Sequence, residues 1–243
     1  MVNVQCSMKT NLLVIHVKGQ RSREAFIEQQ LAALDMPYSY ILDGNKEDLT
    51  PEMLDTWFSG EMHSVGPAAS CTYKHLLACQ HIVDNDLDGA LIIEDDLRFY
   101  SRFKNFFMKS LDEIRSLHAD EPLIANYEES SLMLVPRSKR IKGKVLHLAS
   151  RDRFAGCYYV NRTAALTILS FVREHKTDVP IDRLHSLLTE KGLINYYWSY
   201  PCLACQCSCD GTMPTMIPTR PRPLKRLKWL YKRIYKHLLY SLR

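Results

Sequence analysis

The stretch "ALIIEDDLRFY" (residues 90–100) runs four apolar residues into three adjacent acids, Glu94, Asp95 and Asp96. The short apolar run is typical of a strand that is buried on both faces, as in a parallel sheet. A single acid could cap a following helix, with Asp96 or Ser101 accepting hydrogen bonds from free backbone N–H groups. Three acids in a row repel one another, and a divalent ion with oxygen ligands would offset that repulsion. The stretch therefore predicts a buried strand with a cation site at its carboxyl end.

The segments around this stretch alternate between strand-like and helix-like patterns. In chain order they are 12–17 (strand), 23–34 (helix), 38–44 (strand), 68–84 (helix), 90–93 (strand) and 102–117 (helix). This alternation predicts an α/β fold with a mostly parallel sheet that helices flank on both faces. Ligands of such sheets bind at the carboxyl ends of the strands, so the loops after the first strand and after residues 90–93 are expected side by side.

The chain is long and apolar enough for a substantial core, because 46% of its 243 residues are hydrophobic. No stretch of about 18 uncharged apolar residues predicts a membrane span, and residues 1–20 lack the layout of a secretory signal. We therefore expect a cytoplasmic protein whose eight cysteines are reduced.

Four cysteines crowd into "CLACQCSC", at positions 202, 205, 207 and 209. Thiolates bind zinc and iron–sulfur clusters, so a metal site is one interpretation. Zinc ribbons need a second pair of cysteines at a matching distance, which the chain does not offer, and free thiols in a partly buried loop are the second interpretation. A disulfide is the third, and the sequence leaves all three open.

The positive charge of the chain belongs to its C-terminal end. Nine of the 32 Lys and Arg lie between Arg220 and Arg243, where there is no acid. The other 23 stand against 27 Asp and Glu, so the first 219 residues are mildly acidic. The body therefore offers no basic groove, and nucleic acid is not an expected partner.

The basic end predicts a proline-rich linker followed by an amphipathic helix. The prolines of "MPTMIPTRPRPLKR" favour an extended chain, and after Pro223 apolar residues recur at helical spacing. Lys228, Lys232, Arg233 and Lys236 lie on the other side of that helix. A basic helix rich in Trp and Tyr is typical of one that lies on an anionic membrane surface, where each Lys or Arg contributes about 1 kcal/mol.

There are two alternatives to the membrane surface: the helix could pack on the domain, or it could pair with a second copy of the chain. We expect residues 1–212 to form the α/β domain and residues 213–243 to form the linker and a membrane-surface helix. The protein would then be peripheral, on the inner face of the cell membrane.

The order of motifs resembles that of glycosyltransferase family 25, whose members build lipopolysaccharide and lipooligosaccharide outer chains or galactosylate collagen. The matching pieces, in chain order, are "VIHVKGQRSRE", "YILDGN", "SCTYKHLLACQHIV", "ALIIEDDLRF", "FAGCYYVNRTAALTIL", "VPIDR" and "YPCLACQ". The resemblance covers about residues 10 to 210. It departs from the family at His16, where the family has asparagine, and at Lys74, where it has serine.

The resemblance implies a GT-A fold, which is Rossmann-related, and a nucleotide-diphosphate sugar such as a UDP-sugar as donor. It also implies inversion at the anomeric carbon and a divalent ion, Mn²⁺ or Mg²⁺. Such an ion would stabilise the charge that develops on the leaving phosphates. In this interpretation Asp96 is the principal metal ligand, Glu94 binds the metal or faces the nucleotide, and Asp95 contributes to the donor site.

The resemblance and the loops together suggest further donor-binding residues. Arg21 and Arg23 follow the first strand and could meet the diphosphate or the uracil, although a solvated helix start explains them equally well. Asp43, in the aspartate–glycine step, and His75, in the helix that follows, match donor-site positions of the family. His75 is otherwise a packed core histidine.

Inversion requires one base on the face opposite the leaving group. Asp182 matches the family's aspartate and begins a predicted helix, where it could equally be an acid that the helix dipole stabilises. His147 and His185 are candidates for a third metal ligand, although each alone is more often structural.

Two hypotheses follow. The first is a metal-dependent transferase that moves galactose or glucose from a UDP-sugar to a lipid-linked saccharide such as lipooligosaccharide. The second is a non-enzymatic module that binds a divalent cation and reaches a membrane or a partner through its basic helix.

Overall fold

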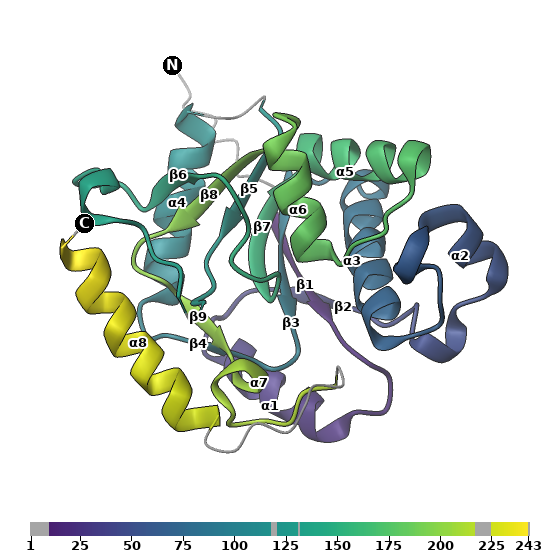
Figure 1. Ribbon diagram of the computed structural model, residues 1–243, viewed down its shortest axis with the longest axis horizontal. Coiled ribbons are helices and arrows are strands. Elements are labelled where there is room, and N and C mark those ends of the chain that lie inside the picture. Colours follow the sequence, from purple (N-terminus) through teal and green to yellow (C-terminus); the bar gives the residue numbers. More distant parts are fainter. Residues whose placement is uncertain (1–9, 118–120, 131, 217–224, 243) are drawn as a thin grey trace.

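Seven strands form one sheet in the order β2-β1-β3-β7-β5-β8-β6 in the computed structural model, which describes residues 10–117, 121–130, 132–216 and 225–242 (Figure 1). The strands are β1 (Thr10–Ile15), β2 (Tyr38–Ile41), β3 (Gly89–Glu94), β5 (Leu123–Asn126), β6 (Leu146–Ala149), β7 (Cys157–Asn161) and β8 (Asn195–Ser199). β7 runs antiparallel to β3 and β5, and β6 runs antiparallel to β8. The other five strands share one direction, so the sheet is mostly parallel.

Helices cover both faces of the sheet (Figure 1). They are α1 (Arg21–Ala32), α2 (Pro51–Trp57), α3 (Pro67–Asp84), α4 (Phe103–Leu117), α5 (Arg162–His175), α6 (Ile181–Glu190), α7 (Cys207–Asp210) and α8 (Lys225–Leu242). Ala90 and Ile92 of β3 pack in the core that α3, α5 and α6 share, whereas Leu91 and Ile93 pack against α1 and α4. A strand buried on both faces explains why residues 90–93 are apolar without alternation.

The structure confirms the predicted fold class, and it contains each strand and helix predicted up to residue 117 in the predicted order, with the short helix α2 in addition. It adds the antiparallel strands β6 and β7, and a two-stranded sheet of β4 (Leu97–Phe99) with β9 (Ala204–Gln206). Because β4 follows Asp96 directly, that acid does not cap the helix α4 after it.

The carboxyl ends of the five parallel strands meet at one edge of the sheet, together with the start of β7 (Figure 1). Ile15 of β1 pairs with Glu94 of β3, so the loop after each strand starts beside the other, as the sequence predicts. Residues far apart in the chain therefore converge at this edge.

The C-terminal helix α8 packs on the domain through its basic side. Lys236 is fully buried, and its ammonium donates to Glu129 Oε1 at 2.8 Å and to the Ser130 carbonyl at 2.7 Å. The Arg233 guanidinium lies 3.0 Å from the same Glu129 oxygen. The side of α8 that faces solvent carries a stripe of apolar side chains, next to the exposed Lys228, with Leu227, Leu230, Tyr231, Ile234, Tyr235, Leu238 and Leu242 exposed.

The predicted amphipathic helix is therefore present. Two of its basic residues face the domain and many of its apolar residues face solvent, whereas a helix that packs on a core usually buries its apolar side. Most of the predicted linker lies outside the described residues, and the boundary between residues 212 and 213 stays a prediction. None of the helices in the described part of the chain combines the length and the hydrophobicity that a membrane crossing requires.

Lys236→Met should release α8 from the domain, because it leaves the buried Glu129 carboxylate without its main cation. Removing one partner of a buried ion pair costs about 3 kcal/mol. Hydrogen exchange of α8 should therefore accelerate strongly in this variant. Lys228→Met is the matched control, since Lys228 is exposed on the same helix, and it should leave exchange unchanged.

Acid should release α8 only at low pH. Burial opposes ionisation of Glu129, but Lys236, Tyr100 and Arg233 outweigh burial and hold its pKa below the usual value. An acid with a lowered pKa stabilises the fold above its unfolded pKa and loses that contribution as the pH falls through the folded value. Exchange in α8 that rises already between pH 7 and pH 5 would contradict this account of the contact.

Candidate active site

The three adjacent acids after β3 enter three different environments. Asp95 is buried between Arg23 and His16: Arg23 Nη1 donates to its Oδ1 at 2.5 Å, and His16 Nδ1 lies 2.8 Å from its Oδ2. Both of its oxygens are therefore engaged within the protein. The histidine that replaces the family's asparagine serves this contact.

Asp96 is equally buried but only half satisfied. Its Oδ2 accepts a hydrogen bond from the backbone N–H of Ser208 at 3.2 Å, at the start of α7, and Oδ1 has no partner. Burial, and then the neighbouring charge of Glu94, raises the pKa of Asp96 from 3.8 to about 6. A buried, unpaired carboxylate oxygen is costly in the absence of a cation, so this oxygen is suited to a metal ion.

Glu94 turns toward α3 and is only partly buried. Its Oε2 accepts from Gln206 Nε2 at 2.8 Å, and its Oε1 lies 3.7 Å from His75 Nε2. Gln206 is in turn held over Gly156, where a Cβ atom would approach its side chain to 2.6 Å. The glycine thus gives Gln206 the room to hold Glu94.

A cavity of about 460 Å³ opens beside these acids, between the loop after β1 and the start of α3. Cations dominate its charged lining, and Asp95 and Glu47 are the acids. The lining cations are Lys18, Arg23, Lys46 and Lys74. Its size and charge suit an anionic ligand as large as a nucleotide.

Lys74 locks the loop after β2 onto α3. Its ammonium donates to the carbonyl of Leu42 at 2.7 Å and to that of Asp43 at 3.0 Å, and Ser70 Oγ donates to the carbonyl of Gly44 at 2.7 Å. Burial, and then the charge of Lys18, lowers the pKa of Lys74 to about 8. This lysine stands where the family has serine, and it fixes one wall of the cavity.

The conformation of the loop after β2 explains why glycine follows Asp43. Gly44 has a φ of +85°, and a Cβ atom there would meet the Tyr73 ring at 2.5 Å. The Asp43 side chain itself points to solvent and pairs with Lys18 at 3.0 Å. Asp43 therefore lies near the cavity without lining it.

The structure separates the two arginines of the loop after β1. Arg23 is buried, borders the cavity and bonds Asp95, and its Nη2 also donates to the Pro214 carbonyl at 2.8 Å. Arg21 is exposed at the first position of α1. Arg21 is thus a solvated helix start, whereas a donor-site role for Arg23, which borders the cavity, stays a prediction.

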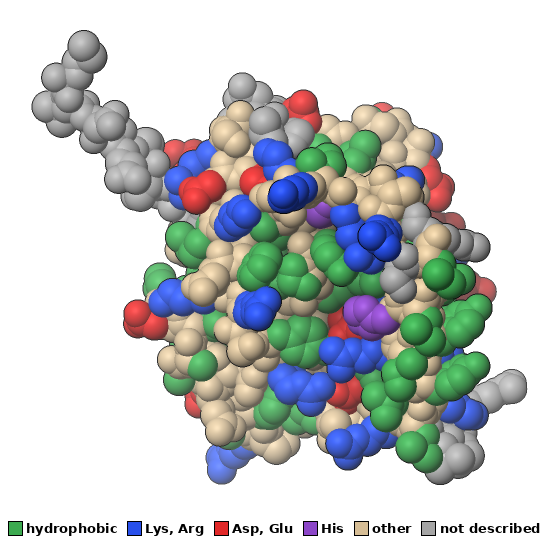
Figure 2. Space-filling model, turned by 90° about the vertical axis from the view of Figure 1, so that its left-hand side faces the viewer, with side chains coloured by type: hydrophobic (Ala, Val, Ile, Leu, Met, Phe, Trp, Pro, Cys, Tyr) green, Lys and Arg blue, Asp and Glu red, His purple; other side chains and the backbone are tan. Residues whose placement is uncertain are grey.

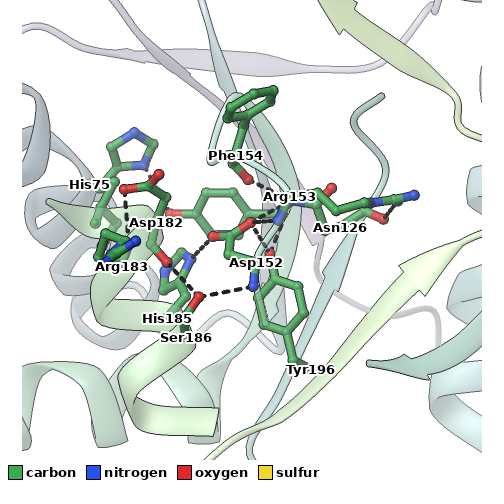
Figure 3. Close-up of polar contacts among 12 residues, drawn as sticks. His75, Asn126, Asp152, Arg153, Phe154, Asp182, Arg183, His185, Ser186 and Tyr196 are labelled. Carbon is green, nitrogen blue, oxygen red and sulfur yellow. Dashed lines mark hydrogen bonds and ion pairs between the residues drawn. The ribbon is translucent and has the colours of Figure 1, made fainter. Parts of the chain in front are cut away.

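Asp182 lies in the first turn of α6, at the same end of the sheet. The backbone N–H of Ile181 donates to Thr72 Oγ1 at 3.2 Å, which brings the start of α6 against α3 beside Cys71. Figure 3 shows the Asp182 side chain on the side of His75. The carboxylate accepts a hydrogen bond from the backbone N–H of Arg183 at 2.9 Å and remains partly exposed.

Two buried acids of this region escaped the sequence analysis. Glu128, after β5, is fully buried, with Oε2 accepting from Gly156 N at 2.7 Å and Oε1 unpaired. Burial, and then Glu94, raises the pKa of Glu128 well above its usual value. Asp152 is the centre of a buried network with Tyr196 (2.6 Å), His185 (2.9 Å) and Asn126 (3.1 Å) (Figure 3). No local motif indicates either acid, because tertiary contacts with residues distant in the chain bring each of them into this region.

The two histidines considered as third metal ligands have other contacts. His185 Nδ1 bonds Asp152, and His147 Nε2 accepts from the backbone N–H of Ile141 at 3.1 Å. His75 is the histidine that lies against Glu94. In the 202–209 segment, Cys202, Cys205 and Cys207 are free thiols, and Cys209 Sγ donates to Gln206 Oε1 at 3.3 Å.

Comparison with known proteins identifies the family. The model of glycosyltransferase family 25 (LPS biosynthesis protein) matches residues 9–185. The chain belongs to glycosyltransferase family 25.

Curated relatives of this family 25 protein match it over part of their length. Procollagen galactosyltransferase 2 of Homo sapiens is 32% identical over 82 residues, which is 34% of this chain and 13% of the relative. Procollagen galactosyltransferase 1 of Danio rerio is 28% identical over 132 residues, 54% of this chain and 21% of the relative.

Solved structures that resemble the chain include a glycosyltransferase involved in the glycosylation of the major capsid of PBCV-1, at 13% identity and a TM-score of 0.43. That match covers 81% of this chain and 93% of that one. A197 from STIV, at 12% identity and a TM-score of 0.44, covers 89% of this chain and 100% of that one.

Neutral substitutions of the two central acids should change stability in opposite directions. Folding raises the pKa of Asp96, so its carboxylate destabilises the fold above pH about 6 and has no such effect below pH about 4, where the acid is protonated in both states. With a chelator at pH 7.5, Asp96→Asn should therefore raise the free energy of unfolding by about 2 kcal/mol.

Asp95→Asn is the matched comparison, because it breaks the buried pair with Arg23, and we expect a loss of about 3 kcal/mol. Urea denaturation at pH 7.5 and pH 4 measures both variants. If Asp96→Asn also destabilised the protein at pH 7.5, the assignment of Asp96 as the unsatisfied acid would be wrong.

Proposed function

We propose that this protein transfers a hexose, galactose or glucose, from a UDP-sugar to a saccharide acceptor, with inversion and with Mn²⁺ or Mg²⁺ as cofactor. The observation that carries the proposal is the cationic cavity that Asp95 lines, together with the adjacent buried residue Asp96, whose Oδ1 has no hydrogen-bond partner. A nucleotide diphosphate brings the negative charge that the cavity lining would attract, and a metal ion would satisfy the free carboxylate oxygen.

The donor set fits a hard divalent ion. Asp96 Oδ1 and Glu94 would hold it, and the unpaired Oε1 of Glu128 adds a third carboxylate to the neighbourhood. Oxygen ligands of this kind suit Mn²⁺ and Mg²⁺. When bound, the ion would neutralise the charge that develops on the departing diphosphate.

The remaining residues position the donor. Lys18, Lys46 and Lys74 line the cavity and would offset the charge of the diphosphate. Arg23 can face the same ligand only in the orientation that Asp95 fixes, because two of its nitrogens are already bonded to the protein. Asp95 would thus position Arg23, whereas Glu94 and Asp96 would bind the metal ion.

Asp182 is the proposed general base. It is the partly exposed carboxylate at the start of α6, close to α3 and Cys71, so an acceptor hydroxyl could approach it from solvent. The base would accept the proton of that hydroxyl as the oxygen attacks the anomeric carbon.

Asp182→Asn should abolish hexose transfer, lowering the rate by about 10³-fold, while UDP binding with Mn²⁺ stays unchanged. Asp96→Asn should abolish Mn²⁺-dependent UDP binding itself. Calorimetry with UDP and hydrolysis of a panel of UDP-sugars separate the two effects. Wild-type protein that fails to bind UDP with Mn²⁺ present would favour the alternative of a non-enzymatic cation-binding module.

We further propose that α8 places the protein on an anionic lipid surface, where a lipid-linked saccharide such as lipooligosaccharide would be the acceptor. Figure 2 views the side that carries α8 and β6, and shows hydrophobic side chains gathered along one margin, with Lys and Arg scattered among other side chains, some of them acidic, over the rest. The apolar stripe of α8 faces outward because its cations Arg233 and Lys236 are turned inward to Glu129.

Charge argues for lipid as the occupant of this face. The described part of α8 has no acid, and the segment beside it carries exposed Arg137, Lys139 and Lys142. Arg140 joins the two, donating to the Tyr240 carbonyl at 3.5 Å. A second copy of the chain would bring like charges together, whereas anionic headgroups complement them. Such a location on the cytoplasmic face also agrees with the free thiols of Cys202, Cys205 and Cys207.

Removal of two stripe residues should release the protein from vesicles. Leu230→Ser with Ile234→Ser removes apolar surface without changing charge, and both side chains are at least half exposed, so the fold should persist. We expect about 100-fold weaker co-sedimentation with anionic vesicles. Leu166→Ser with Leu193→Ser, exposed elsewhere, is the matched control.

Equal sedimentation of the two double variants would contradict the proposal for α8. A wild-type dimer in solution that the α8 variant dissociates would assign the stripe to a second copy and would contradict it as well.

A further inference from the structure

A thiol, an imidazole and a carboxylate meet where α3 passes the end of β3. One ligand atom from each of Cys71, His75 and Glu94 lies within 4.8 Å of the other two, the only such group of three His, Cys, Asp or Glu side chains among the described residues. We propose that these three side chains form a binding site for Zn²⁺. The proposal goes beyond the transferase function, because it concerns a different ion and two ligands that the proposed hexose transfer does not use.

The spacing of the three groups suits a tetrahedral ion. Cys71 and His75 are four residues apart on α3, so both project from one face of the helix. His75 Nε2 and Glu94 Oε1 are 3.7 Å apart, which is too far for a hydrogen bond. Two ligand atoms that each lie about 2.1 Å from a tetrahedral ion are about 3.4 Å apart. A small closing movement would therefore complete the coordination.

His75 is prepared as a ligand. Its side chain is fully buried, its Nε2 has no hydrogen-bond partner, and its Nδ1 lies 2.9 Å from the Tyr158 hydroxyl. Histidines that bind zinc generally donate the other ring N–H to an oxygen, which fixes the ring and directs the free lone pair at the metal. An ion at this point would also satisfy a nitrogen that is otherwise buried without a partner.

Glu94 is supported in a similar way, because its second oxygen accepts from Gln206 at 2.8 Å. Cys71 borders the donor cavity, which gives an ion a path from solvent and leaves room for a water as fourth ligand. Hydrogen bonds with Tyr158 and Gln206 thus fix His75 and Glu94, and Cys71 lies where the site opens to the cavity.

The ligand chemistry distinguishes this site from the one at Asp96. Thiolate and imidazole ligands select Zn²⁺, whereas carboxylate oxygens alone suit Mn²⁺ and Mg²⁺. Glu94 belongs to both sets, so Zn²⁺ at Cys71 and His75 would withdraw Glu94 from the donor site and inhibit transfer. Cys71 serves the zinc site alone and Asp96 serves the donor site alone, so the two proposals can fail separately.

Cobalt substitution tests the site directly. Co²⁺ added to chelator-treated full-length protein should give a thiolate-to-cobalt charge-transfer absorption with the strong visible bands of a tetrahedral ion, and Zn²⁺ should displace it. Cys71→Ser should abolish the charge-transfer band and weaken Zn²⁺ binding about 100-fold. Tyr158→Phe should weaken it about tenfold and leave the band in place.

Two control variants are needed to interpret the cobalt spectrum. Cys202→Ser changes a cysteine of similar exposure and should leave the cobalt spectrum unchanged. Asp96→Asn should keep the spectrum while it loses Mn²⁺-dependent UDP binding, which separates this proposal from the transferase function. A thiolate band that persists in Cys71→Ser, or the absence of any thiolate band in the folded wild-type protein, would overturn the zinc site.

Discussion

The structure depends on how three adjacent carboxylates are accommodated at the end of a buried strand. Backbone alternation sends them in different directions, and each meets a different environment. Asp95 pairs with Arg23 and contacts His16, Glu94 turns to α3 and Gln206, and Asp96 keeps one oxygen unpaired. Arg23 thus offsets part of the repulsion among the three acids, and one buried oxygen of Asp96 remains for a ligand. The loop after β1 and the helix α7 are both anchored to these acids, and the first of them borders the cavity.

The strands and helices of the first half of the chain could be predicted from residue pattern alone. Residues 90–93 are apolar on both faces, and α3 and α4 have a clear helical period, so local sequence and tertiary structure agree. Asp96 could be ranked first among the acids, although the reason became visible only in the fold. Asp95 could not be assigned, because its partner Arg23 is 72 residues away in the chain.

Residues without a local signal could not be found in this way. Glu128, whose neighbour Glu129 binds α8 instead, and Asp152 lie in irregular segments, and they reach the site because β7 runs antiparallel between β3 and β5. Cys71 and the core cysteine Cys79 lie on the same helix, and the position of Cys71 at the cavity and near Glu94 is visible only in the fold. Chain spacing describes neighbours on one element, whereas these contacts are set by the order of strands in the sheet.

The helix α8 shows a similar limit. Its amphipathic pattern is plain in the sequence, yet the pattern does not say which side faces the domain. The answer depends on Glu129, a buried acid about 100 residues earlier that attracts Lys236 and Arg233 and so turns the apolar side outward. Electrostatic pairing thus decides the orientation against the usual preference of apolar residues for the interior. This orientation leaves the apolar side chains of α8 exposed to solvent.

The most direct test of this account is the location of the metal in crystals grown with UDP and Mn²⁺, measured by anomalous diffraction. The account predicts a manganese peak beside Asp96 Oδ1 and Glu94, with Asp95 still bonded to Arg23 and His16. A manganese ion coordinated by Asp95, with Arg23 displaced, would contradict the division of roles among the three acids.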